Sequence, residues 1–230
     1  MVCGKPGVKL GLIGPGRHGK RYLEPQNGGE RFVGSAGSAP GAVAALVARV
    51  DAVVIATPPA THEELTMLCL EAGKPVLVEK PLALDLAACE RLVAASERLG
   101  VPLMVAHTHL WARLFQSLER WRLCEVSWCG PEREDGSCPA WLDWGAHAHA
   151  MGVALGTSRI HSAKMAQRLT VATDGVRVYR GGTEPGESPM HAMVETFLRV
   201  CRGDRDWRSM PAFTRSVYRS LFAGRESVVI

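Results

Sequence analysis

Three glycines in the segment GLIGPGRHGK, residues 11–20, constrain the fold of this chain more than any other feature. Gly14, Gly16 and Gly19 follow the pattern G-x-G-x-x-G and come directly after the apolar run VKLGLI at residues 8–13. In a strand–loop–helix unit the first glycine permits a tight turn, the second lets a pyrophosphate approach the backbone, and the third lets the helix pack on the strand. The pattern alone is weak, so its meaning depends on the elements around it.

The first half of the chain alternates short apolar runs with helical patterns. Strands are expected at residues 8–13, 31–35, 51–59, 74–81 and 101–107. Helices are expected between them at residues 17–24, 41–49, 61–72 and 82–100. Thr61 and Glu64 form a T-x-x-E capping box at the start of the third of these helices, and Gly73 is expected to end it. This order predicts an α/β fold with an N-terminal Rossmann-type, doubly wound parallel sheet.

After about residue 110 the pattern changes. Strands are expected at residues 125–129, 160–174 and 176–181, and helices at 190–202 and 211–223. We therefore expect a dinucleotide-binding domain at residues 1–110. A smaller, substrate-binding α+β domain with a reduced open sheet is expected at residues 111–230.

Composition excludes several other classes of protein. The 230 residues carry a net charge of +4, and their basic residues are scattered, which argues against a nucleic-acid partner. The N-terminus has no apolar signal core and no apolar run approaches 18 residues, so we expect a cytoplasmic protein with no membrane partner. Seven cysteines without a C-x-x-C pair argue against a disulfide scaffold, and Cys124, Cys129 and Cys138 match no usual zinc spacing.

One part of the dinucleotide pattern is absent. An acidic residue usually ends the second strand and binds the ribose hydroxyls, but here the segment is Ser35-Ala36-Gly37-Ser38. Small side chains leave room for a 2′-phosphate, with which Arg17 of the glycine loop can pair. We therefore expect NADP or NAD as cofactor and favour NADP. The absent carboxylate also predicts weak cofactor affinity.

Three further segments follow the glycine loop in order: ATPPATH at 56–62, VLVEKPLAL at 76–84 and LDWGAHAHAM at 142–151. With the loop, they resemble the Gfo/Idh/MocA family, the group of glucose–fructose oxidoreductase and inositol dehydrogenase. The resemblance implies a Rossmann domain that binds NAD(H) or NADP(H) and a second domain with an open sheet that shapes the substrate site. It also implies an enzyme that transfers a hydride between the cofactor and a small polar carbinol or carbonyl compound. The implied substrate is a sugar, a cyclitol or a biosynthetic intermediate, including an imine.

The resemblance implies catalytic roles for Lys80, Asp143 and His147. Lys80 of the E-K-P motif is expected to contact cofactor and substrate, as a proton relay and orienting group. Asp143 and His147 lie four residues apart, so on a helix they share a face. Histidine exchanges protons near neutral pH, so we expect His147 to act as acid and base. We expect Asp143 to accept a substrate hydrogen bond, with a helix N-cap as its alternative role.

The expected cofactor-binding residues come from the glycine loop, the end of the second strand, and the ATPPATH and E-K-P segments. They are Gly14, Gly16, Arg17, His18, Gly19, Ser35, Ser38, Thr57, Pro58, His62, Glu79 and Lys80. Three tryptophans either line the cleft or belong to the core: Trp111, Trp141 and Trp144. The expected partner is a small-molecule substrate, and a homo-oligomer is left open.

The chain departs from the family pattern in ways that keep other functions open. The stretch after the second strand is much reduced, and only about 40 residues separate LDWGAHAHAM from the helix at 190–202. The alternative is a family member with weakened or lost cofactor use, acting as a non-redox pathway enzyme, with or without a metal, or as a ligand-binding module. His107 and His109 form an H-x-H pair suited to chelation on a strand, whereas members of such a pair diverge on a helix. We expect no metal site.

Overall fold

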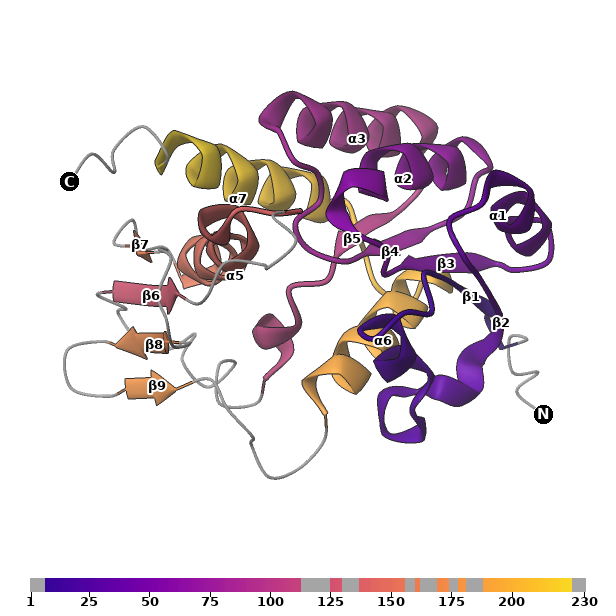
Figure 1. Cartoon of the computed structure of the whole chain (residues 1–230), viewed down its shortest axis with the longest axis horizontal. Coiled ribbons are helices and arrows are strands. Elements are labelled where there is room, and N and C mark those ends of the chain that lie inside the picture. Colours follow the sequence, from indigo (N-terminus) through magenta and orange to yellow (C-terminus); the bar gives the residue numbers. More distant parts are fainter. Residues whose placement is uncertain are drawn as a thin grey trace.

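A five-stranded parallel sheet forms the N-terminal part of the molecule (Figure 1). Its strands are β1 (Leu10–Ile13), β2 (Phe32–Ala36), β3 (Ala52–Ile55), β4 (Val76–Val78) and β5 (Leu103–Val105). Their order in the sheet is β2-β1-β3-β4-β5, and each neighbouring pair is parallel. This arrangement confirms the expected Rossmann-type sheet. Its switch point lies at β1, where the chain order reverses.

In this computed structural model the described residues are 7–112, 125–129, 137–155, 160–161, 169–173, 178–180 and 188–224. Within these ranges no helix is both long and apolar enough to cross a lipid bilayer.

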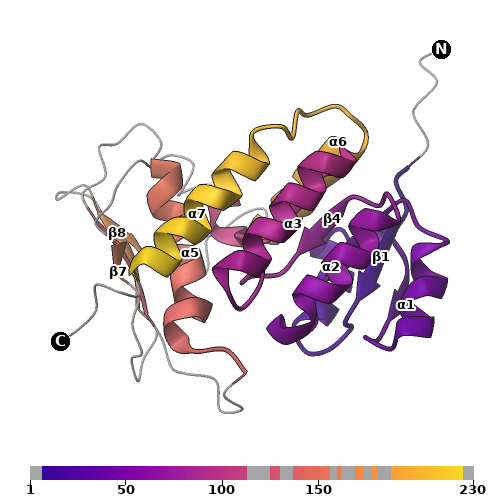
Figure 2. The ribbon, with the colours of Figure 1, turned by 90° about the horizontal axis from the view of Figure 1, so that it is seen from above.

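Three helices cover one face of the sheet (Figure 2). They are α1 (Pro40–Val47), α2 (His62–Glu71) and α3 (Leu86–Leu99). Strand β3 is Ala-Val-Val-Ile with every residue buried, because a strand covered on both faces has no polar side to alternate. Helix α3 begins at a true cap, since the Asp85 carboxylate accepts the Ala88 amide at 2.7 Å, and it ends at Gly100 with φ +65°.

Helix α6 (Pro189–Cys201), from the far end of the chain, covers the opposite face of this sheet. Met193 and Phe197 of α6 are fully buried in one cluster with Leu12 of β1 and Val54 of β3. The core of the Rossmann unit therefore includes residues from beyond position 110. The proposed boundary at residue 110 stays a prediction.

The segment after the glycine loop corrects one expectation. A single helix was expected at 17–24, but the chain forms three short 3₁₀ helices: η1 (Gly19–Leu23), η2 (Pro25–Asn27) and η3 (Gly29–Arg31). Pro25 disfavours helical backbone at the preceding residue, and Glu24 is extended with ψ 137°. Gly28 is left-handed with φ +83°, which breaks the helix again.

The expected capping box of α2 is also wrong. Thr61 has helical backbone angles, φ −102° and ψ −4°, whereas an N-cap residue is extended. The Thr61 hydroxyl donates to Thr57 Oγ1 at 2.7 Å and also lies 2.9 Å from the Pro58 carbonyl oxygen. A 3₁₀ turn, η4 (Pro59–Thr61), leads directly into α2. Gly73 ends the helix as expected, with φ +70°.

A second sheet and two helices form the other part of the molecule. Its described strands are β6 (Glu125–Cys129), β7 (Ile160–His161), β8 (Leu169–Thr173) and β9 (Val178–Arg180), in the order β7-β6-β8-β9. The strand expected at 160–174 is described as β7 and β8, and the residues between them lie outside the described ranges. Helix α5 (Ala140–Leu155) packs on β6 and on α7 (Met210–Gly224), and α7 also packs on α3 (Figure 2). The expected smaller α+β part is thus confirmed.

The role of α6 as a cover for the parallel sheet is testable. Truncating fully buried Phe197 to Ala should lower the free energy of unfolding by about 3–5 kcal/mol, the usual cost of such a cavity. Arg199→Ala on the exposed side of the same helix should change it by less than about 0.5 kcal/mol. Urea unfolding followed by circular dichroism measures both. Equal effects would contradict the assignment.

Candidate cofactor and substrate site

The glycine loop lies at the carboxyl end of β1, at the switch point of the sheet. The Gly14 amide donates to the Ala36 carbonyl at the end of β2 at 2.8 Å, and Gly14 has φ +90°. A side chain at Gly14 would come within 2.7 Å of Thr57, and one at Gly19 would overlap the Gly14 carbonyl. At Gly16, in contrast, a Cβ atom would meet no neighbouring atom within 4 Å. This open, exposed backbone is a cradle that fits a nucleotide pyrophosphate.

Beside the loop, the end of β2 carries small side chains. Ser35 and Ser38 are exposed, and so is Arg17 in the loop itself. Pro58 is exposed as well, whereas Thr57 is buried and accepts the hydroxyl of Thr61. The geometry leaves Arg17 and the two serines accessible to a ligand.

Glu79, at the end of β4, faces inward to the protein. Its Oε1 atom lies 2.8 Å from His18 Nε2 and accepts the Tyr22 hydroxyl at 2.6 Å. Burial would raise the pKa of Glu79, but hydrogen bonds from His18 and Tyr22, helped by the charge of Lys80, hold this pKa below its usual value. Burial, together with the Glu79 charge, raises the pKa of Tyr22 far above its usual value. Glu79 therefore anchors the glycine loop, a role that the sequence did not indicate.

Lys80, the next residue, contacts the second part of the molecule. Its Nζ atom lies 2.6 Å from Asp143 Oδ1 and 3.1 Å from the Asp143 carbonyl oxygen. Both side chains are nearly buried, with exposed fractions of 14% and 8%. The Lys80 ammonium also lies 5.6 Å from the ring centre of Trp144. Since α5 begins at Ala140, Asp143 is in its first turn and is not its N-cap.

His147 lies one turn further along α5, close to two histidines that follow β5. Its ring centre is 5.1 Å from that of His109 and 6.2 Å from that of His107. His149 faces elsewhere, with Nδ1 2.8 Å from Ser220 Oγ on α7, as expected for an H-x-H pair on a helix. Among the described residues no three metal-binding side chains are grouped so as to hold an ion.

His107 is buried, and neither of its ring nitrogens has a hydrogen-bond partner among the described residues. Burial is the main cause that lowers the pKa of His107 to about 3, and the positive charge of Lys80 adds to it. Burial also lowers the pKa of His149 to about 4. Both imidazoles are therefore neutral at physiological pH.

Two further side chains hold the loops that follow β3 and β4. His62 is fully buried, with Nδ1 2.7 Å from the Pro81 carbonyl oxygen and Nε2 2.9 Å from the Thr57 carbonyl oxygen. The Tyr218 hydroxyl of α7 accepts the Leu82 amide at 2.6 Å. His62 thus lies behind the site, where it positions both loops. No local signal in the sequence pointed to Tyr218.

The three tryptophans have different surroundings. The Trp144 ring lies beside the Lys80 ammonium, 5.6 Å from its Nζ atom to the ring centre. The Trp111 indole donates to Thr196 on α6 at 2.9 Å, and Trp141 packs edge-on against Phe222 at 5.4 Å between ring centres. Trp111 and Trp141 therefore serve mainly in packing.

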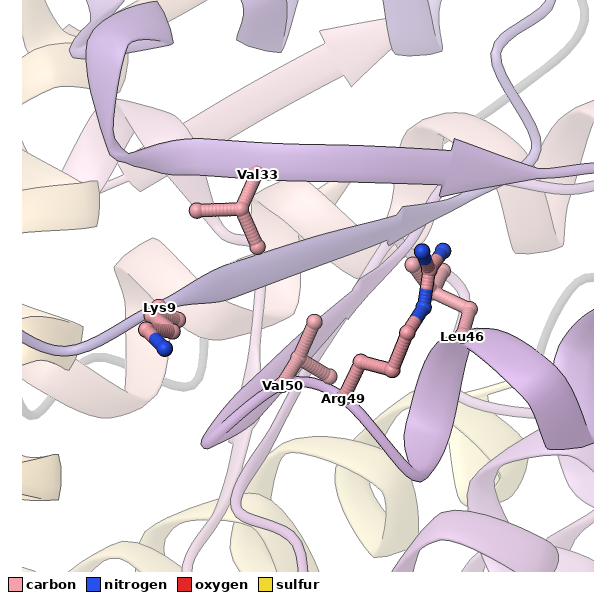
Figure 3. A pocket seen from close by; sticks show the side chains of 5 residues that line it. All are labelled: Lys9, Val33, Leu46, Arg49 and Val50. Atoms are coloured by element: carbon pink, nitrogen blue, oxygen red, sulfur yellow. The ribbon is translucent and has the colours of Figure 1, made fainter.

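A separate cavity of about 240 Å³ lies at the opposite, amino end of β1 (Figure 3). It is lined by Lys9, Val33, Leu46, Arg49 and Val50. Because the glycine loop follows the carboxyl end of β1, this cavity is no part of the site described above.

The parallel sheet and the glycine loop together have the arrangement of a Rossmann-type fold. Residues 36–107 match the model of the GFO_IDH_MocA family, an oxidoreductase family with an NAD-binding Rossmann fold. This match confirms the resemblance to the Gfo/Idh/MocA family that the sequence indicated.

The similarity to individual proteins covers different shares of this chain. Inositol 2-dehydrogenase 2 of Saccharopolyspora erythraea is 56% identical over 57 residues, which cover 25% of this chain and 17% of that protein. The match thus spans less than a fifth of this curated relative. UDP-N-acetylglucosamine 3-dehydrogenase GnnA of Acidithiobacillus ferrooxidans is 18% identical with a TM-score of 0.74, covering 96% of this chain and 97% of its own. KijD10, a 3-ketoreductase from Actinomadura kijaniata solved with NADP, is 16% identical with a TM-score of 0.71, covering 96% and 97%. The two structures share the fold.

The three glycines should respond differently to substitution. Gly19→Ala forces a side chain into the Gly14 carbonyl, so it should lower the free energy of unfolding by about 1–3 kcal/mol. Gly16→Ala meets no atom and should change it by less than about 0.5 kcal/mol. Urea unfolding without nucleotide is the measurement. A Gly16→Ala variant as unstable as Gly19→Ala would contradict the open surroundings of Gly16.

The neutral state of His107 predicts a loss of stability in acid. An unfolded histidine titrates near pH 6.5, whereas His107 in the fold has a pKa of about 3. As the pH falls below about 6.5, the unfolded chain binds a proton that the fold excludes, and stability drops by up to about 1.4 kcal/mol per pH unit. Between about pH 6.5 and 4.5, His107→Asn should make the free energy of unfolding less dependent on pH, by the contribution of about one proton. Urea unfolding at several pH values tests it, and an unchanged slope would contradict it.

Proposed function

We propose that this chain is an NAD(P)-dependent oxidoreductase that acts on a small polar carbinol or carbonyl compound. The observation that carries the proposal is the Lys80–Asp143 ion pair at 2.6 Å. It joins the edge of the sheet where a nucleotide fits to the helix that carries His147. Taking two charges out of water costs free energy, so a nearly buried ion pair at the junction of two structural units supports a functional role.

The chemistry follows from the oxidation of an alcohol, in which a bound nicotinamide accepts the hydride. The hydroxyl proton must leave at the same time, and His147 on α5 is the proposed base. Lys80 donates a hydrogen bond to the substrate oxygen, and Asp143 holds its ammonium group in place. In the reducing direction His147 returns the proton. Positioned proton transfer of this kind contributes about 10²–10⁴-fold to the rate.

The finer proposals concern cofactor and substrate. Exposed Ser35 and Ser38, with no carboxylate at this end of β2, favour NADP, whose 2′-phosphate Arg17 can bind. The name of the relative from Saccharopolyspora erythraea makes inositol the first substrate to test. The absent carboxylate also favours the second candidate, a family member that binds nucleotide weakly and acts without redox chemistry.

Nucleotide titration tests the first candidate. We expect NADPH and NADH to bind at micromolar to millimolar concentrations, seen as a change in nucleotide fluorescence. Absence of binding of either nucleotide at millimolar concentration would refute the first candidate.

Turnover of inositol with NADP⁺ or NAD⁺, followed by nicotinamide absorbance, tests the residues. Lys80→Met and His147→Ala should each lower kcat by about 10²-fold or more, because each removes a group that moves or orients a proton. Lys9→Met, at the opposite end of β1, is the matched control and should leave kcat unchanged. Unchanged rates in the first two variants would remove these residues from the mechanism.

A further inference from the structure

We propose that the cavity at the amino end of β1 is a second ligand site, which binds a small carboxylate with a branched apolar body. The cavity lies at the opposite end of β1 from the glycine loop, so this inference goes beyond the proposed function and does not depend on it. Two observations carry it: an apolar lining held by close packing, and an oriented arginine whose charge is not paired.

Most of the lining is apolar. Leu46 of α1 and Val50, which follows that helix, are buried, whereas Val33 on the edge strand β2 is 57% exposed. Two glycines let α1 pack closely on the sheet here, because a Cβ atom at Gly11 or Gly34 would lie only 3.1 Å or 3.3 Å from Leu46. The cavity is therefore formed by packed elements and opens to solvent beside Val33.

Arg49 brings an oriented positive charge to this lining. Its Nε atom donates to the Ala45 carbonyl oxygen in the last turn of α1 at 3.2 Å. Its Nη2 atom lies over β2, 3.8 Å from the position of a Cβ atom at Gly34. Among the described residues, neither Arg49 nor the Lys9 ammonium has a carboxylate partner. The terminal nitrogens of the guanidinium are thus left for a ligand.

The charges around the cavity favour an anion. Lys9 lies at the other side of the cavity from Arg49 and adds a second cation (Figure 3). The Asp51 carboxylate accepts the backbone amide of Lys9 at 2.8 Å and is no part of the lining. The lining therefore carries two positive charges and no negative one. A carboxylate can accept two parallel hydrogen bonds from the guanidinium of Arg49.

Size and polarity together define the class of ligand. The volume of about 240 Å³ is below the range of about 300–1,000 Å³ for sites that hold drug-sized molecules, so the ligand is small. A bare phosphate would leave the apolar lining exposed to water. A branched carboxylate places its apolar body on Leu46 and Val50, where burial is favourable, and its charge at Arg49.

Isocaproate is the probe, and isocaproamide, which has the same shape without the charge, is the matched control ligand. Nuclear magnetic resonance of the isotope-labelled protein would follow the backbone amides during each titration at constant pH and ionic strength. Isocaproate should bind with a millimolar dissociation constant, as expected of so small a ligand, and isocaproamide about three- to tenfold more weakly. The shifts should saturate and be largest at the lining residues Val33, Leu46, Arg49 and Val50.

Three variants separate the contribution of charge from that of the apolar lining. Arg49→Gln should weaken isocaproate binding about three- to tenfold, the range for a charge-assisted contact with an exposed group, and leave isocaproamide binding unchanged. Arg98→Gln removes an exposed arginine of α3 and should bind both ligands as the wild type does. Val33→Ser should weaken both ligands alike. Circular dichroism checks that each variant is folded.

Several results would overturn the inference. They are shifts that do not saturate or that scatter over the surface, isocaproamide binding as tightly as isocaproate, and Arg49→Gln with wild-type affinity. Inorganic phosphate that shifts the same resonances as strongly would also overturn it, because the cavity would then attract charge alone. None of these results bears on the proposed function, which the nucleotide titration tests at the glycine loop.

Discussion

Glu79 and Lys80 are consecutive residues at the end of β4, and their side chains bind two different parts of the chain. The Glu79 carboxylate holds His18 and Tyr22 at the glycine loop, and the Lys80 ammonium holds Asp143 on α5. Strand β4 is hydrogen-bonded on both sides, to β3 and β5, so both side chains start from a rigid position. Groups on such an element are held more precisely than groups on loops. The end of β4 thus positions both the glycine loop and helix α5, which carries the proposed acid and base His147.

The charged side chains at the end of β4 position the neighbouring elements more than they stabilise the fold. Taking a carboxylate and an ammonium out of water costs several kcal/mol for each ion, and their mutual attraction only about offsets this cost. The Lys80–Asp143 pair is nearly buried, and Glu79 is buried with two hydrogen-bond donors. An apolar pair of similar size would stabilise the fold at least as well. Under the proposed function, these charges serve a reaction that needs a fixed cation beside a nucleotide.

Local sequence was sufficient for those features that depend on neighbours along the chain. The strand order followed from apolar runs separated by helical segments, and Gly14, Gly16 and Gly19 have the geometry that their spacing indicated. The family motifs also put Lys80 and Asp143 in one site, although they are 63 residues apart. The geometry of Glu79 was not foreseen, because the motif does not say which way its side chain faces.

Features that depend on distant contacts or on local competition were missed. The Leu82–Tyr218 hydrogen bond spans 136 residues, and α6 begins 84 residues after the last strand of the sheet that it covers. Hydrophobic periodicity carries no information about either contact. Pro25 disfavours helical backbone at Glu24, and this local effect overrides the helical pattern of residues 17–24. At Thr61 the hydroxyl bonds back to Thr57, which displaces the cap that the T-x-x-E pattern suggested.

The central claim is that a dinucleotide binds across the glycine loop at the switch point of the parallel sheet. Hydrogen–deuterium exchange of the intact protein, with and without saturating NADH, tests it most directly. The account predicts slower exchange in residues 14–20 and in the segments that follow β3 and β4. Slower exchange confined to the cavity around Lys9 and Arg49, or no change anywhere at saturation, would contradict it.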